Sequence, residues 1–130
     1  MDYRYVVRLT PVSKKNSQQI ITNSKTGRPM VIPSKAYRDY EKNAPWFLTP
    51  KPKKPIDYPI NLQCLFYMPT HRKCDLVNML ECIQDVLVKA GVLVDDNFAV
   101  VESVDGSKVL YDKNNPRTEI YITGKDKDDD

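Results

Sequence analysis

The chain has 130 residues, with 20 Lys and Arg against 17 Asp and Glu and a net charge of +3. This length predicts a single domain, which we expect to span residues 1–124, followed by a charged, disordered tail at residues 125–130. Three cysteines without C-x-x-C spacing argue against a disulfide framework and a structural zinc site, and favour a reducing cytoplasm. No apolar run approaches the ~20 residues that cross a bilayer, and none follows a basic start, so neither membrane insertion nor secretion is indicated.

The net charge is the sum of two opposite halves. Residues 1–74 carry 14 Lys and Arg and 4 Asp and Glu, whereas residues 75–130 carry 6 and 13. A basic half can neutralise phosphates, while an acidic half concentrates a metal ion. The division therefore indicates a nucleic-acid partner.

Strand-like segments and polar loops alternate at the start of the chain. Residues 3–10 mix β-branched, aromatic and polar residues and predict a strand that Pro11 ends. Residues 19–22 and 29–32 predict a hairpin around the turn at 23–27. The two loops of this region offer side chains for contacts with DNA phosphates, namely Lys14, Lys15, Asn16, Lys25 and Arg28.

A first helix is expected over residues 35–44, with Ser34 as its N-cap. Tyr37 and Tyr40 recur at helical spacing, which favours core packing over stacking on DNA bases. Residues 45–59 hold five of the ten prolines and predict a connecting loop. The three lysines of this loop favour a solvated segment over DNA contact.

Residues 60–68 are a run of strand formers that ends at Pro69. The strand delivers His71, Arg72 and Lys73 to the same place as the carboxylate of Asp75. We expect Arg72 and Lys73 to contact DNA phosphates or to stabilise charge at the reacting phosphate.

Residues 75–90 predict a second helix, which Gly91 ends. Its apolar face is formed by Leu76, Leu80, Ile83, Leu87 and Ala90. A second face gathers Asn78, Glu81, Asp85 and Lys89.

Three further strands are expected after this helix. Residues 98–103 and 107–110 should pair with each other around 104–106, and residues 118–123 should form the last strand. The chain as a whole predicts an α+β fold, a small mixed sheet of four to six strands with two main helices. The start and polar face of the second helix should lie at the active edge.

Carboxylates at the start of the second helix and beyond its end indicate a two-part cage for a divalent cation. Mg²⁺ prefers oxygen ligands and usually takes few carboxylates, so Asp75 with Asp95 and Asp96 suffices, and such a cage usually acts on phosphodiesters. Each acid also has a structural alternative: Asp75 as an N-cap, Asp95-Asp96 as a turn, and Asp85 as a solvated residue or hydrogen-bond acceptor.

These residues resemble a known family. Lys73-Cys-Asp75-Leu-Val-Asn78, then Asp85, then Ala90-Gly-Val-Leu-Val-Asp95-Asp96 is similar to the RusA family of Holliday junction resolvases, most closely over residues 70–122. The family pattern is Asp-x-Asp-Asn-x-x-Lys opening a helix, a later Asp, and then Gly-Val followed by Asp-Asp. The resemblance implies a homodimeric, Mg²⁺-dependent endonuclease, with Mn²⁺ as a substitute, that resolves four-way DNA junctions by paired nicks in recombination and repair. It further implies a phage or prophage variant that acts in the cytoplasm of a bacterial cell.

Two positions depart from the family pattern. Val77 stands where the family has its second Asp, and Glu81 stands where it has Lys. Because positions 77 and 81 are one turn apart, we hypothesise that Glu81 replaces the missing acid. The replacement for the lysine is open among Lys73, Arg72 and Lys89.

The resemblance assigns roles to Asp75, Asn78, Asp85, Asp95 and Asp96, and the hypotheses above add Glu81 and Lys73. The expected catalytic residues are Asp75, Asp96, Glu81 and Lys73, and the expected metal ligands are Asp75, Asp95, Asp96, Glu81 and Asp85, with Asn78 in support. Three rival functions remain: a branched-DNA-binding module that has lost catalysis, a Mg²⁺ nuclease acting on flaps, forks or RNA, and a non-enzymatic interaction domain. The last is disfavoured because it leaves the acids and the basic half unexplained.

Overall fold

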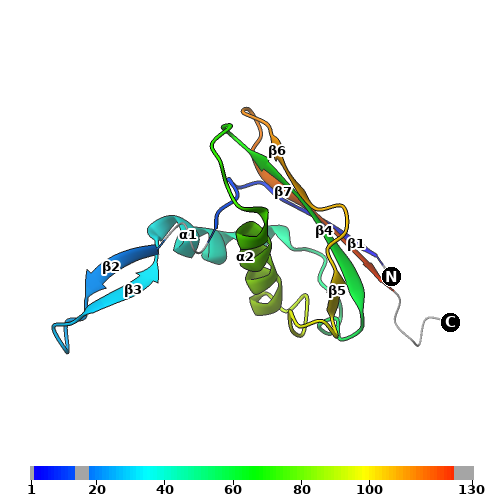
Figure 1. Cartoon of the computed structure of the whole chain (residues 1–130). Coiled ribbons are helices and arrows are strands. Elements are labelled where there is room, and N and C mark those ends of the chain that lie inside the picture. The colour runs from blue at the N-terminus through cyan, green and yellow to red at the C-terminus, as the bar shows by residue number, and fades with distance from the viewer. Residues whose placement is uncertain (1, 14–17, 125–130) are drawn as a thin grey trace.

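The computed structural model describes residues 2–13 and 18–124 (Figure 1). Its elements in chain order are β1 (Tyr3–Val7), β2 (Gln18–Thr22), β3 (Pro29–Pro33), α1 (Lys35–Asn43), the 3-10 helix η2 (Ala44–Phe47), β4 (Ile60–Met68), α2 (Leu76–Lys89), β5 (Val101–Ser103), β6 (Lys108–Tyr111) and β7 (Arg117–Gly124). Lys14, Lys15, Asn16 and residues 125–130 lie outside the described residues. The short helix η2 lies in the segment that the sequence predicts to be a loop.

A mixed sheet of five strands is built around β4. The order is β1-β7-β4-β5, and β6 also pairs with β4. Strand β7 is antiparallel to both β1 and β4, whereas β5 and β6 run parallel to β4. Helix α2 makes the crossover that two parallel strands need. The predicted α+β fold with a mixed sheet and two main helices is confirmed.

The predicted pairing of residues 98–103 with 107–110 is wrong. Strand β5 pairs with the first residues of β4, and β6 pairs with the last, so both extend the same edge of β4. Gly106, with φ of 84°, therefore marks a step along that edge rather than a reversal of the chain.

Side chains of β4 explain this step. The Asn61 Oδ1 accepts hydrogen bonds from the Ser103 hydroxyl at 2.6 Å and the Asp105 amide at 2.8 Å. The Nε2 of Gln63 donates to the Gly106 carbonyl at 3.3 Å. These bonds satisfy backbone groups that a regular ladder would otherwise pair.

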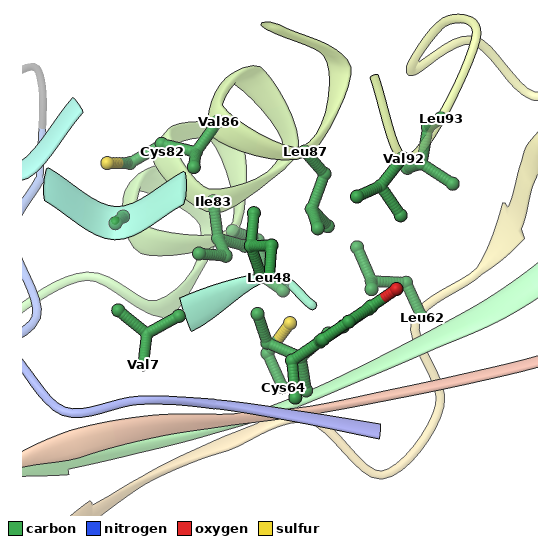
Figure 2. Close-up of a cluster of buried hydrophobic side chains, with 14 of the residues drawn as sticks. Val7, Leu48, Leu62, Cys64, Cys82, Ile83, Val86, Leu87, Val92 and Leu93 are labelled. Atoms are coloured by element: carbon green, nitrogen blue, oxygen red, sulfur yellow. The ribbon is translucent and has the colours of Figure 1, made fainter. Parts of the chain in front are cut away.

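One face of the sheet packs against the helices. Burial alternates along β4 and β7, as expected for strands with one covered face. Figure 2 shows Cys82, Ile83, Val86 and Leu87 of α2 close to Leu48 and to Val7, Leu62 and Cys64 of the sheet. The predicted apolar face of the second helix is confirmed at Leu80, Ile83 and Leu87, which are buried.

Both helices begin at the predicted caps. The Ser34 hydroxyl accepts from the Tyr37 amide at 3.3 Å, and the Asp75 Oδ1 accepts from the Val77 amide at 3.0 Å. Tyr37 and Tyr40 are buried, which confirms core packing rather than base stacking.

The hairpin of β2 and β3 forms a separate two-stranded sheet that projects away from the main sheet (Figure 1). The Asn23 Oδ1 accepts hydrogen bonds from the amides of Lys25 and Thr26, and Gly27 adopts a φ of 70°. The predicted hairpin is therefore confirmed. Within the described residues, no helix is both long and apolar enough to cross a membrane.

Candidate active site

Asp75 lies at the point where the basic loop after β4 enters α2. Its side chain is exposed and caps the helix through the bond to the Val77 amide. The alternative role of Asp75 as an N-cap is therefore confirmed. A carboxylate has about four lone-pair positions, so one backbone bond leaves capacity for a cation.

Asp95 and Asp96 lie beyond the other end of α2. The Asp95 Oδ1 accepts a hydrogen bond from the Asp96 amide at 2.7 Å, and bonds from Asp96 hold the pKa of Asp95 below its ordinary value. Loss of hydration, the hydrogen bond shared with Asp95, and the charges of Asp95 and Asp85 raise the pKa of Asp96. Asp85 of α2 therefore lies within electrostatic reach of this pair, and the three acids make a strongly negative region that suits a cation.

Asp75 does not join this region within one chain. Helix α2 has 14 residues and is therefore ~21 Å long, with Asp75 before its first turn and Asp95-Asp96 after its last. Backbone bonds of 2.9 Å tie Val92 and Val94 to Ile56, which precedes the start of β4, whereas Asp75 follows its end.

The donor atoms suit a hard divalent cation, but the ligands of one chain are not assembled. Across residues 2–13 and 18–124, no three His, Cys, Asp or Glu side chains are arranged to hold a metal ion. The described residues of a single protomer therefore do not form a complete centre.

The polar face of α2 runs along the helix between the Asp75 end and the Asp95-Asp96 end. Glu81 is exposed in the middle of the helix, one turn from Val77, and Asn78 is half-buried beside the first turn. The Lys89 Nζ lies 2.9 Å from the Glu41 Oε1, so this candidate for the missing lysine is engaged with α1.

The predicted DNA-binding cations occupy two exposed places. Lys25 and Arg28 lie at the turn of the β2-β3 hairpin, and Arg72 and Lys73 lie in the loop before α2. Among the described residues, neither Arg72 nor Lys73 forms an ion pair. These two cations are therefore available to an anion next to Asp75.

Two features at the sheet have no signal in the sequence. The rings of His71 and Tyr111 stack with centroids 3.8 Å apart. Arg117 binds Asp112 at 2.9 Å and Glu119 at 2.8 Å and lies over the Tyr67 ring. The His71–Tyr111 and Arg117–Tyr67 contacts join segments that are distant in sequence, so no local sequence pattern predicts them.

The chain is similar in sequence to known nucleases. The family described as endodeoxyribonuclease RusA matches residues 9–123. The chain is also similar to a crossover junction endodeoxyribonuclease RusA of Aquifex aeolicus (strain VF5), with 34% identity over 88 residues that cover 67% of this chain and 66% of the relative. The chain thus spans slightly less than two thirds of that relative's length. Nucleases of this family are metal-dependent. With a match over most of its length, and as its sequence motifs predict, the chain belongs to the RusA family.

Proposed function

We propose that this protein is a metal-dependent endodeoxyribonuclease that resolves four-way DNA junctions by paired nicks, in recombination and repair. The observation that carries the proposal is that the exposed cations Arg72 and Lys73 lie next to the carboxylate of Asp75 at the start of α2, in a chain of the RusA family. Cations beside a carboxylate suit a phosphodiester, because they bind its oxygens and neutralise its charge.

The second basic surface supports a branched substrate. The hairpin that carries Lys25 and Arg28 projects away from the sheet (Figure 1). Phosphate contacts made by this hairpin, away from Asp75, would hold the protein on DNA without reading the base sequence. Such contacts suit a substrate whose arms diverge.

The metal ligands in this proposal are Asp75, Asp95, Asp96, Glu81 and Asp85, and the metal is Mg²⁺ or Mn²⁺. Because Asp75 and Asp95-Asp96 lie at opposite ends of α2, the function requires a homodimer in which Asp75 of one protomer meets Asp95 and Asp96 of its partner. A twofold axis across α2 places the start of one helix beside the end of the other. Each dimer then has two centres, as paired nicks require.

Exposed apolar side chains at both ends of α2 support this dimer. Val77 is 61% exposed near Asp75, whereas Val94 is 53% and Phe98 is 88% exposed on either side of Asp95-Asp96. Aromatic and aliphatic side chains of this kind are typical of the buried centre of an interface. A second copy of the chain would cover them.

A bound metal supplies Lewis-acid stabilisation and a more acidic water molecule. The chain's own contribution is to bind and orient the phosphodiester. Arg72 and Lys73 neutralise its oxygens, Asp75 remains fixed by its bond to the Val77 amide, and Asn78 supports the first turn. We assign Glu81 the role of the second Asp of the family pattern, where this chain has Val77.

In this proposal the protein is encoded by a phage and acts in the cytoplasm of a bacterial cell. Cys64, Cys74 and Cys82 are all free thiols, as a reducing compartment favours.

The test is cleavage of a labelled four-way junction beside linear duplex of the same sequence, with Mg²⁺ or EDTA, by wild type and Asp96→Asn. Paired nicks in the junction that need Mg²⁺ and disappear in the variant support the proposal. Tight junction binding without nicks in Mg²⁺ or Mn²⁺ identifies a recognition module instead. Preference for flaps, forks or RNA identifies a nuclease of another specificity.

A further inference from the structure

A pocket of about 620 Å³ lies beside the start of α2. Ser13 forms part of its wall, Met68 and Met79 contribute apolar surface, and Arg72, Lys73 and Cys74 come from the loop that leads into Asp75. The pocket therefore joins the segment after β1, the end of β4 and the first turns of α2.

We propose that this pocket takes up one unstacked deoxynucleotide from the branch point of the DNA. The base lies against Met68, which is only partly buried, and the phosphate lies between Arg72 and Lys73. This inference rests on the proposed function and adds to it the means by which a branch is distinguished from continuous duplex.

The mixed chemistry of the lining favours a nucleotide over a phosphate alone. The volume falls in the range of pockets that hold small organic ligands, ~300 to 1,000 Å³, and exceeds the needs of a phosphate group. Methionine side chains are flexible and polarisable, so they accept flat rings of different outline. Unstacked bases are commonly received on apolar or aromatic side chains.

Ser13 supplies a polar group for the edge of the base. The residue is only 8% exposed, and its buried hydroxyl has no hydrogen-bond partner among the described residues. Buried hydroxyl groups normally have a partner. This hydroxyl is closed off from the pocket, so the Ser13 side chain must turn toward the pocket before the donors and acceptors of a base can provide the partner.

The position of the pocket connects it to branched DNA. Cys74 lines the pocket and directly precedes Asp75, so a nucleotide held there adjoins the phosphodiester presented to that carboxylate. Inside a continuous duplex, extracting a base costs a few kcal/mol of stacking and pairing, and the cost is lower where pairing is already disturbed. A branch point therefore fills the pocket more readily than linear duplex does.

The chain contains a reporter for this pocket. Cys74 is exposed and lines it, whereas Cys64 and Cys82 are 0% and 1% exposed. The rate at which iodoacetamide alkylates Cys74 can thus be followed by peptide mass spectrometry on the full chain, with Cys74→Ser as proof of the labelled position. The reaction is run in EDTA so that DNA is bound without cleavage.

Three DNA substrates separate a nucleotide in the pocket from DNA that merely lies over it. They are an intact four-way junction, the same junction with one abasic site at each branch nucleotide in turn, and linear duplex of the same sequence. At ten times the dissociation constant, the intact junction should slow alkylation about tenfold. One particular abasic position should restore the free rate while a gel-shift assay shows unchanged binding. Equal protection by all abasic junctions, or by saturating duplex, overturns the proposal.

Two variants and one small ligand complete the test. Ser13→Ala should reduce the protection, whereas Thr123→Ala, at an exposed position of β7, should not. Equal protection of both variants would contradict the role given to Ser13. If the junction does not bind at all, the proposed function fails, and thymidine 5′-monophosphate then tests the pocket alone. Protection of Cys74 by this nucleotide but not by inorganic phosphate supports the pocket, and protection by neither rejects it.

Discussion

Mixing two inactive variants tests whether the metal centre is shared between protomers. Asp75 precedes the first turn of α2 and Asp96 follows its last, and the helix between them is ~21 Å long, whereas Mg²⁺ binds its oxygens at ~2.1 Å. One ion cannot bind both residues of one chain in this fold. We expect Asp75→Asn and Asp96→Asn each to abolish cleavage of a four-way junction when assayed alone.

The mixture should recover part of the activity. In a heterodimer of the two variants, one shared centre contains both substitutions, and the other contains Asp75 and Asp96 from different protomers and is intact. Random pairing makes half of the dimers heterodimers, each with one of two centres, so about a quarter of the wild-type centres are restored. Because each active dimer has a single centre, the product should be a nicked junction rather than two resolved duplexes.

The assay uses the two variants co-expressed with different affinity tags, so that the heterodimer can be purified and compared with each homodimer on a labelled junction. Co-expression of Asp75→Asn with Asp75→Ala is the matched control, and it should remain inactive. An inactive heterodimer that still binds the junction would refute the shared centre. A chain that is monomeric at assay concentrations would refute it directly.

Four further predictions concern the site and the fold. Asp75→Asn should keep the helix cap and the stability of the protein but lose cleavage, whereas Asp75→Ala should lose cleavage and also about 1 kcal/mol of unfolding free energy, because Asn caps a helix and Ala does not. Glu81→Gln should lose most cleavage and keep junction binding, because it removes the acid that we place in the position vacated at Val77. Burial raises the pKa of Tyr5 to about 12, so its contribution to stability is complete below the unfolded value near 10 and is lost as the pH rises through 12. Tyr5→Phe should therefore lower the unfolding free energy at pH 8 by about 1 kcal/mol, through the lost hydrogen bond to the Pro50 carbonyl, and should make the decline above pH 10 shallower. Asn61→Ala should cost about 1 to 2 kcal/mol and accelerate amide exchange at Asp105, whose amide would lose its acceptor.

Denaturant unfolding, cleavage and binding assays check these outcomes. Ser34→Ala is the control for Asp75→Ala, because it should remove the cap of α1 at a similar cost while leaving cleavage intact. Cleavage by Asp75→Asn at the wild-type rate would reduce Asp75 to a cap. Full activity of Glu81→Gln would end the hypothesis of a replaced acid. If stability declines with pH in Tyr5→Phe as it does in wild type, the prediction for Tyr5 is wrong. If amide exchange at Asp105 is unchanged in Asn61→Ala, the prediction for Asn61 is wrong.

Local signals in the sequence identified most elements and both helix caps. Ser34 and Asp75 are followed at once by helical apolar spacing, and the turn around Asn23 and Gly27 is defined by residues within five positions of one another. Such information is contained in a short window. The sequence motif was likewise sufficient to predict the family.

Long-range pairing was not accessible in the same way. A turn signal at Gly106 is equally compatible with a hairpin and with a step along β4, and the decision depends on Asn61 and Gln63, more than 40 residues earlier. The two carboxylate clusters looked adjacent because both flank one helix. The length of that helix, however, separates them, and in our proposal a second protomer reunites them.

The pairing of β1 with β7 brings the first and last described strands side by side. Tyr3 lies opposite Ile122, and within the described sheet the edge strand β1 pairs with β7 alone. A circularly permuted protein that joins these two strands and opens the turn at Ser24 would retain the sheet and the core while cutting the hairpin. Such a permutant would separate the contribution of a continuous hairpin from that of the fold, without a single amino-acid substitution.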